Sequence, residues 1–301
     1  MLELIFLGTG GVMPNENRGL PSIILRRGAE LFMFDCGECS QRQMFMAKLG
    51  FNRRMKIFIT HMHGDHIFGL PGLLHSMSFL GRNRVLEIFG PEGIVEFIEA
   101  ICKTIKFNPT FPLTVHQADS GRLIEEEDYV VDAAWMEHGF PCLGFALTEK
   151  DKPGRFDPAK ARALGVPEGP LWKKLQRGET VTVNGAEVTP AQVLGPSRKG
   201  VKIVYITDTK PCKNAIELAK NASILMYDCT FDSMKADRAW KYGHSTSVDA
   251  AMIAKEANVG KLVLLHVSTM YRDATPLLNE AKEIFPDTIM AFDMMRLPVT
   301  P

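Results

Sequence analysis

The residues best suited to chemistry are three histidines and an aspartate within six positions, His61-Met-His63-Gly-Asp65-His66. A folded core has little use for so many ionisable groups, because a buried imidazole costs desolvation energy unless it is bonded. In a loop, neighbouring side chains can turn to different sides, so His61 and His63 can bind one ion and Asp65 and His66 a second. Imidazole nitrogen and carboxylate oxygen suit zinc, with manganese or iron as alternatives.

Three more candidate ligands stand where apolar segments end. Four ligands cannot complete two coordination spheres, and functional residues of open α/β sheets gather at the carboxyl ends of strands. Such positions are held by His138, Asp208 and His266. The aspartate can bridge two cations, one through each oxygen. Two bridged cations make water nucleophilic at neutral pH and neutralise developing charge, so these residues predict a dinuclear hydrolase of a phosphodiester, an ester or a lactam.

The remaining histidines differ in their surroundings. His75 lies in a helical pattern and His116 in a short strand, so both are predicted to be structural. His244 lies in the polar turn Gly243–Thr246, just before a helical segment. An imidazole in such a turn is free to transfer protons, which makes His244 a candidate acid or base.

The elements that position these residues are short strands alternating with helices. This alternation predicts a layered α/β architecture, with an antiparallel section of sheet around 113–148. Ser247 with Asp249 is predicted to cap its helix. The predicted strands are Leu2–Leu7, Leu31–Phe34, Lys56–Ile59, Leu86–Phe89, Tyr129–Trp135, Lys202–Ile206, Ile224–Tyr227 and Lys261–Leu265, and the predicted helices are Gln41–Leu49, Leu70–Leu80, Gly93–Ile105, Lys213–Lys220, Ser247–Ala257 and Pro276–Ile284.

One segment, Lys150–Arg177, interrupts this alternation. It holds four prolines and eight Lys or Arg against three Asp or Glu. Such a composition adds little to a core and predicts a protruding arm, with a solvated loop of no function as the alternative. The cations that give this segment its local positive charge, and that could contact phosphates of a partner, are Lys152, Arg155, Lys160, Arg162, Lys173, Lys174 and Arg177.

The overall composition is that of a globular protein. Hydrophobic residues make up 46% and charged residues 23%, which excludes a disordered, collagen-like or coiled-coil chain. No apolar run reaches the roughly 18 residues of a membrane span, and the first residues indicate a strand and not a signal peptide. The 35 basic and 35 acidic residues balance, so any contact with nucleic acid requires a local basic patch. Six sparse cysteines predict reduced thiols and a cytoplasmic location.

Longer motifs resemble those of a known family. The segment Ile59-Thr-His-Met-His-Gly-Asp-His-Ile67 carries the His-x-His-x-Asp-His mark of the metallo-β-lactamase superfamily. Within it, the chain resembles short-form ribonuclease Z, the transfer RNA 3′-processing endonuclease, over nearly its whole length. Matching motifs are Phe6-Leu-Gly-Thr-Gly-Gly11, Phe34-Asp-Cys-Gly-Glu38, Gly69-Leu-Pro-Gly-Leu-Leu74, His244-Ser-Thr246 and Leu265-His-Val-Ser268, with Gly165-Val-Pro-Glu-Gly-Pro170 in the arm.

The resemblance implies a role for each candidate. It places one zinc on His61, His63 and His138, a second on Asp65, His66 and His266, and Asp208 between the two. It also implies that Asp35 supports the site from outside the ligand set and that Asp65 steers the attacking hydroxide. His244, together with Asp228, would protonate the departing 3′-oxygen of the ribose. The family commonly has glutamate at the position of Asp228, so the reach toward His244 is one methylene shorter here.

The resemblance further implies the architecture and the substrate. The fold is expected to be a metallo-β-lactamase αββα sandwich, a single domain over 1–301 with the arm inserted at 150–177. We expect a homodimer that cuts precursor transfer RNA with two zinc ions per chain, leaving a 3′-hydroxyl on the transfer RNA and a 5′-phosphate on the trailer. The alternatives are a small-molecule phosphodiesterase, an arylsulfatase-like or lactonase-like hydrolase, and an RNA-binding or scaffold protein with a dead site. The presence of all seven ligands argues against the dead site.

Overall fold

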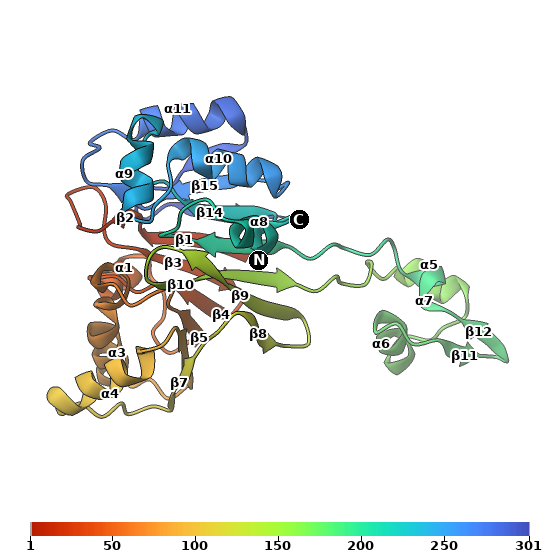
Figure 1. Ribbon diagram of the computed structural model, residues 1–301. Helices are drawn as coiled ribbons and strands as arrows, with labels where there is room; N and C mark the ends of the chain where they lie inside the picture. The colour runs from red at the N-terminus through yellow and green to blue at the C-terminus, as the bar shows by residue number, and fades with distance from the viewer. Residues whose placement is uncertain (1, 301) are drawn as a thin grey trace. The chain divides into compact units, whose positions relative to one another are not determined.

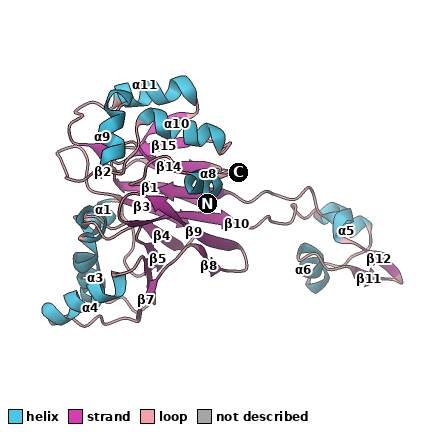
Figure 2. Cartoon of the chain, viewed as in Figure 1, coloured by secondary structure: helices cyan, strands magenta, loops and turns pink. Residues whose placement is uncertain are grey.

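Two seven-stranded sheets lie face to face at the centre of the fold in the computed structural model, which describes residues 2–300. Helices cover the outer face of each sheet, so the layers run helix, sheet, sheet, helix (Figures 1 and 2). Aromatic side chains fill the space between the sheets: Phe34 of the first sheet lies 5.5 Å, between ring centroids, from Tyr205 of the second. Phe58 and Phe145 make a similar contact at 5.4 Å. The predicted αββα sandwich is therefore confirmed.

The first sheet joins an antiparallel half to a parallel half. Strands β18, β1, β3 and β4 pair antiparallel, and β4, β5, β6 and β7 pair parallel. In sheet order the strands are β18 (Arg296–Val299), β1 (Leu2–Gly8), β3 (Ser22–Arg27), β4 (Glu30–Phe34), β5 (Arg54–Phe58), β6 (Leu86–Gly90) and β7 (Leu113–Gln117).

The second sheet has the same division. Strands β13, β14, β15 and β17 are parallel, and β8 and β9 pair antiparallel, within the section that was predicted to be antiparallel. In sheet order the strands are β17 (Thr288–Met290), β15 (Leu262–Leu265), β14 (Ile224–Asp228), β13 (Lys202–Ile206), β10 (Pro141–Glu149), β9 (Tyr129–Glu137) and β8 (Gly121–Glu125). A short parallel pair, β2 (Gly10–Gly11) with β16 (Val267–Ser268), joins the chain after β1 to the chain after β15.

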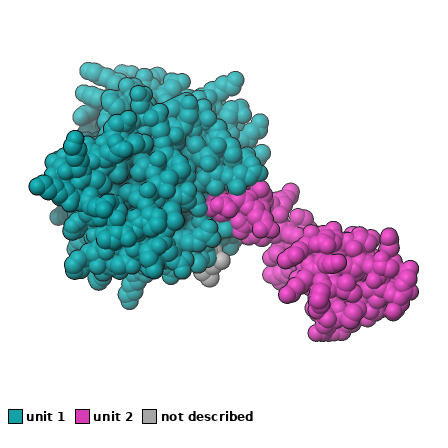
Figure 3. Space-filling view, turned by 90° about the horizontal axis from the view of Figure 1, so that it is seen from below, with its two compact units in different colours: residues 1–125, 130–147, 202–300 teal, residues 126–129, 148–201, 301 magenta. Residues whose placement is uncertain are grey.

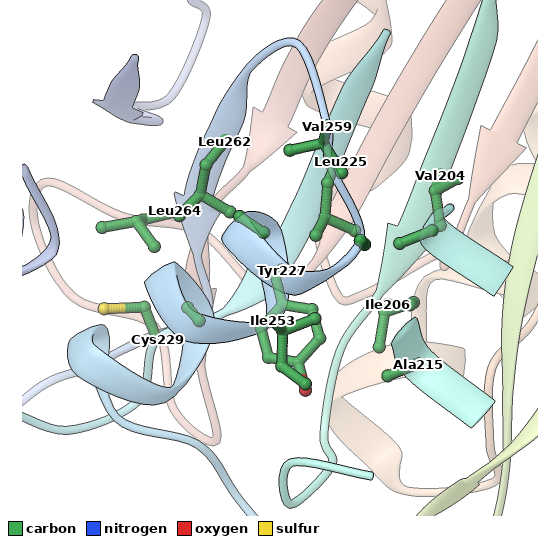
Figure 4. Packing of buried hydrophobic residues seen from close by; sticks show 14 of the residues in the cluster. Val204, Ile206, Ala215, Leu225, Tyr227, Cys229, Ile253, Val259, Leu262 and Leu264 are labelled. Carbon is green, nitrogen blue, oxygen red and sulfur yellow. The ribbon is translucent and has the colours of Figure 1, made fainter. Parts of the chain in front are cut away.

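The helices bury one face each against a sheet. Side chains alternate between the two faces of a strand, so Leu225 and Tyr227 of β14 share one face, and both belong to the hydrophobic cluster that contains Ile253 (Figure 4). None of the helices within residues 2–300 is long and apolar enough to cross a membrane. The helices of the first sheet are α1 (Ser40–Met46), α2 (Gly64–Ile67), α3 (Gly69–Phe79) and α4 (Ile94–Thr104), and those of the second are α8 (Lys213–Ala219), α9 (Ala236–Lys241), α10 (Ser247–Glu256) and α11 (Thr275–Ile284), with a 3₁₀ turn at Ser233–Lys235.

The start of α10 differs from the prediction by one residue. The cap is Thr246, not Ser247: the Thr246 hydroxyl accepts the Asp249 backbone N–H, and the Asp249 carboxylate accepts the Thr246 backbone N–H. Both residues can cap a helix, but the exchange requires a spacing of three, and Thr246 with Asp249 provides it. The cap holds the end of the turn that carries His244.

Residues 126–129 and 148–201 form a second compact unit (Figure 3). Its elements are α5 (Pro158–Ala163), α6 (Pro170–Gln176), the hairpin β11 (Val181–Val183) with β12 (Ala186–Val188), and α7 (Pro190–Val193). The expectation that residues 150–177 add little to a core was wrong. Ala161, Val166 and Leu175, from the predicted arm 150–177, pack against residues that follow it, and the whole core comprises Ala161, Val166, Leu175, Val181, Val188 and Val193.

Candidate metal centre

The ends of strands from both sheets bring the predicted ligands together. His61 follows β5 and His138 follows β9, while Asp208 follows β13 and His266 follows β15. All seven predicted ligands fall in groups whose ligand atoms lie within 4.8 Å of one another. The groups are His61, His63, His138 and Asp208; Asp65, His66 and His266; and Asp208, Asp228, His244 and His266.

Asp208 stands between two sets of histidines and presents a different oxygen to each. Its Oδ2 lies 3.7 Å from His61 Nε2 and 3.9 Å from His138 Nε2. Its Oδ1 lies 3.5 Å from His66 Nε2 and 3.0 Å from His266 Nε2. Burial raises the pKa of Asp208, but the attraction of His266 and His66 outweighs it and holds this pKa well below its usual range. The carboxylate is therefore ionised and suited to bridge two cations.

The chemistry of these donors fits a pair of metal ions. The Nε2 atoms of His66 and His266 are buried, and although Asp208 Oδ1 lies near both, neither atom makes a hydrogen bond of acceptable geometry with a described residue. A buried polar atom without a partner is costly, and a bound cation would supply the missing partner. Burial and the neighbouring His66 lower the pKa of His61 well below its usual value, which keeps that imidazole in the neutral form that binds metal.

The other ring nitrogen of each buried histidine is held by the protein. Nδ1 of His66 lies 2.7 Å from Asp35 Oδ2, and Nδ1 of His138 lies 2.8 Å from the Gly243 carbonyl oxygen. Nδ1 of His61 lies 3.0 Å from the Thr60 hydroxyl, and Nδ1 of His266 lies 2.9 Å from the Thr230 hydroxyl. These contacts orient Nε2 of all four rings toward the centre, as in established metal sites. Sequence reasoning identified Asp35 but missed Thr60, Thr230 and Gly243.

Asp35 is itself held by three donors. Its carboxylate accepts the Thr60 backbone N–H at 2.8 Å and the Tyr205 hydroxyl at 2.8 Å, and the Thr60 hydroxyl lies 3.0 Å from both of its oxygens. It is fully buried between the two sheets. Tyr205 belongs to β13, so this network ties the His66 side of the centre to the strand that delivers Asp208.

Three site residues have left-handed backbone conformations. The φ angles are 54° at Asp35, 50° at Asp208 and 61° at His266. Such angles are uncommon outside glycine and persist where the surrounding structure requires them. Asp35 and His266 directly follow a strand, and Asp208 lies two residues after one, so the turn out of the strand is what aims each side chain into the centre.

His244 and Asp228 form a pair beside the metal ligands. His244 Nδ1 lies 3.1 Å from Asp228 Oδ2, so the shorter aspartate does reach the ring. The Thr230 hydroxyl donates to Asp228 Oδ1 at 2.6 Å and lies 3.2 Å from His244 Nδ1. Burial lowers the pKa of His244, but Asp228 outweighs it and raises this pKa to about 9. The imidazole is therefore protonated at neutral pH, the form that a proton donor needs.

The other two histidines lie apart from these groups. His75 is exposed in α3, with its ring 5.3 Å from that of Phe107. His116 in β7 stacks on Phe89 at 4.5 Å. Neither belongs to any potential metal group found among residues 2–300.

The predicted arm cations all lie in the second unit, and they fall into two classes. Lys152 pairs with Glu149, and Arg162 pairs with Glu168 and lies over the ring of Trp172. The others are exposed, and within residues 2–300 they have no acidic partner: Arg155, Lys160, Lys173, Lys174 and Arg177. Phe156 and Trp172 pack on the core of the unit with their ring centroids 5.1 Å apart.

Gly11 makes room for a predicted ligand. A Cβ atom at Gly11 would lie 2.4 Å from His266 Cε1 and 2.8 Å from its Nε2, so the ring would have to move. We expect Gly11→Ala to weaken metal binding at least roughly tenfold, because His266 can no longer adopt its place. Metal content after dialysis against graded chelator measures the effect. Gly50→Ala is the control, since the nearest atom to its Cβ is 3.6 Å away; equal retention by both variants would contradict the prediction.

Comparison with known proteins extends these observations. The family model described as Anti-Pycsar protein Apyc1 matches residues 2–102, about a third of the chain. A ribonuclease Z of Methanosarcina acetivorans is 44% identical over 300 residues, covering 99% of this chain and 98% of the relative. The chain belongs to the ribonuclease Z family. This membership confirms the resemblance predicted from the motifs, and with it a metal-dependent endoribonuclease that processes the 3′ end of transfer RNA.

Solved structures agree with the membership in the ribonuclease Z family. The crystal structure of human tRNase Z, short form, matches with a TM-score of 0.72 and 27% identity, covering 99% of this chain and 100% of the human one. A metallo-β-lactamase fold protein from Bacillus subtilis matches with a TM-score of 0.71 over 99% of this chain and 100% of its own. At 17% identity, that second likeness concerns the fold alone.

Proposed function

We propose that this chain removes 3′ trailers from precursor transfer RNA by hydrolysing the phosphodiester bond after the discriminator base. The cut leaves a 3′-hydroxyl on the transfer RNA and a 5′-phosphate on the trailer. The observation that carries the proposal is Asp208, whose two oxygens face two sets of imidazoles in a chain of the ribonuclease Z family. A shared carboxylate between two ligand sets is the arrangement of a two-metal phosphodiester hydrolase.

The metal part of the proposal is two zinc ions per chain, with manganese or iron as alternatives. One ion would be held by His61, His63 and His138, the other by Asp65, His66 and His266, and Asp208 would be shared. Such ions, when bound, lower the pKa of water and neutralise charge on the phosphate oxygens.

Asp65 has a second task in this proposal. Its Oδ2 accepts the backbone N–H of Val12 at 2.9 Å and lies 3.4 Å from His66 Nε2. A carboxylate held in this way can accept a hydrogen bond from water and orient it toward the phosphorus. Asp65 therefore combines metal binding with positioning of the nucleophile.

Protonation of the departing oxygen is the task assigned to His244. Nδ1 of His244 faces Asp228, so its Nε2 carries the proton available to the 3′-oxygen of the ribose. Asp228 holds the ring through Nδ1 and favours its charged form. Backbone N–H groups of Thr209 and Ser245, both 3.3 Å from Asp228 Oδ2, keep this carboxylate in place.

We expect His244→Ala to slow the cleavage of precursor transfer RNA by roughly 10²–10⁴, the usual contribution of a positioned general acid. The loss should be smaller on a nitrophenyl phosphodiester, because nitrophenolate leaves without protonation. Single-turnover rates on both substrates, with metal content checked, measure the difference. An equal loss on both substrates would point to a binding or structural role for His244.

The second unit is proposed as the binding site for the body of the transfer RNA. Its five unpaired cations, Arg155, Lys160, Lys173, Lys174 and Arg177, suit contacts with phosphates, which need no particular sequence. We further propose that the single metallo-β-lactamase domain carries this unit as an insertion and acts as a homodimer, as the family resemblance implies, and that it is cytoplasmic, as the sparse cysteines predict.

Cleavage of a trailer-bearing precursor, with both new ends mapped, tests the function. We expect a 3′-hydroxyl directly after the discriminator base, and we expect activity to be lost with chelator and restored by zinc. Metal analysis should give about two equivalents per chain. Hydrolysis of nitrophenyl diesters without cleavage of the precursor would favour a small-molecule phosphodiesterase, and fewer than about two equivalents of metal would favour the dead-site alternative.

A further inference from the structure

The candidate metal centre is accessible to solvent at His63. Among its histidines, His61, His66, His138 and His266 are buried, while His63 is exposed. A substrate must therefore approach on the side where the His63 ring lies.

Phe140 stands beside this exposed ligand. Its ring centroid lies 5.1 Å from that of His63, at an interplanar angle of 43°. It occupies the turn between β9 and β10, two residues after His138, so the backbone that places a predicted ligand also places this ring. About half of the side chain, 51%, is exposed. Burial of an aromatic ring in the core is favourable, yet half of this ring is exposed to solvent beside His63.

A cavity adjoins the same turn. Pro141, the next residue, lines a space of about 470 Å³, whose other lining residues are Glu92, Gln117, Ala118, Asp119 and Trp135. That volume lies in the range of pockets that hold small organic ligands, and a nucleobase is of that size. The turn therefore presents the apolar ring of Phe140, and the residue after it borders a space large enough for a base.

We infer that Phe140 stacks on a nucleobase next to the scissile phosphate and so positions the RNA for cleavage. This inference rests on the proposed function, because it needs a single-stranded RNA segment at the centre. The 3′ end of a transfer RNA precursor is such a segment, and unpaired bases are commonly bound by stacking on aromatic side chains. Either the discriminator base or the first trailer base satisfies the chemistry, and the experiment separates the two.

The test combines substitution with abasic substrates. Three precursors are compared under single-turnover conditions: an intact one, one without the discriminator base and one without the first trailer base. The unaltered protein should cleave one abasic precursor roughly 5- to 100-fold less efficiently, the usual range for one stacked base. Phe140→Ala should cleave the intact precursor more slowly than the unaltered protein, by a similar factor. It should cleave the sensitive abasic precursor at the same rate as the unaltered protein. Phe140→Trp should again cleave the intact precursor faster than the sensitive abasic precursor.

Controls separate stacking from structural damage. Phe79→Ala, at an 86% exposed phenylalanine that ends α3, should cleave like the unaltered protein. If Phe140→Ala slows all three precursors equally, or loses metal, the ring supports His63 and the inference is overturned. The inference is also overturned if Phe140→Ala cleaves the intact precursor at the normal rate while the unaltered protein cleaves an abasic precursor more slowly than the intact one. No cleavage of the intact precursor by the unaltered protein would overturn the proposed function, and this inference with it.

Discussion

Replacement of Asp208 by alanine is expected to reduce hydrolysis of every substrate, nitrophenyl diesters included, by more than about 10³-fold. One oxygen of the Asp208 carboxylate faces each ligand set. Its loss therefore alters the coordination of both metal ions at once. Even removal of a partner outside the ligand set typically costs 10–100-fold in metal affinity or activity, so loss of a shared ligand should cost more. Turnover and metal content are measured on the same preparation.

The control for this variant is Asp132→Asn in β9, an aspartate that pairs with Arg122 and belongs to none of the metal groups. It should keep the turnover and metal content of the unaltered protein. Circular dichroism separates a lost site from a lost fold. An Asp208→Ala protein that retains full turnover and two equivalents of metal would show that the two-metal assignment is wrong.

Removal of the second unit is expected to reduce cleavage of precursor transfer RNA by at least about 10²-fold while hydrolysis of a small diester changes by no more than about twofold. All seven predicted ligands belong to the first unit, and the cations proposed to bind RNA belong to the second. Without those cations fewer phosphates are neutralised, and the salt-dependent part of the binding energy decreases. The affinity of the intact protein should therefore fall steeply with salt, and that slope should be flatter after the deletion.

The structure indicates where to make this deletion. Lys152 and Arg198 exchange both backbone hydrogen bonds, each 2.9 Å long, as the closing pair of a two-residue hairpin does. Residues 153–197 can thus be replaced by Asn-Gly without reaching the sheets. A deletion that ends at 176 would divide the small core, because Leu175 packs with Val181 and Val188.

A charge variant tests the same point with the unit intact. Lys173, Lys174 and Arg177 are changed together to glutamine, and the matched control changes three exposed lysines of the first unit, Lys48, Lys103 and Lys106. The variant in the second unit should bind the precursor more weakly than the unaltered protein, and its affinity should depend less steeply on salt concentration. The control variant should match the unaltered protein in both respects. If the deletion processes precursor as well as the intact protein does, the second unit has no part in binding RNA.

Local patterns predicted eight of the fourteen strands in the two seven-stranded sheets and six of the eleven helices between residues 2 and 300. Strand β13 has the predicted limits, Lys202–Ile206, and α8 differs by one residue from Lys213–Lys220, because apolar runs and helical spacing are signals contained in a few neighbouring residues. β3 (Ser22–Arg27) and β10 (Pro141–Glu149) were not predicted individually. β3 ends in two arginines, and β10 begins with proline and contains glycine, features that weaken a strand signal until sheet neighbours supply the burial.

The sequence by itself determined the chemical character of the centre. The density of imidazole and carboxylate groups over His61–His66, and the placement of Asp208 and His266 after apolar runs, indicate metal chemistry without any knowledge of the fold. Ligand type and strand-end position are local properties, and they suffice to name the candidates.

Tertiary structure decided which groups hold those candidates. The Gly243 carbonyl that accepts from His138 is 105 residues away in the chain, and Tyr205, which donates to Asp35, is 170 residues away. It also decided that residues after Arg177 complete the core of the second unit, and that Phe140 lies against the one exposed histidine among the described ligands. Such contacts depend on how the sheets and turns pack, and a pattern within a few neighbouring residues carries no record of that packing.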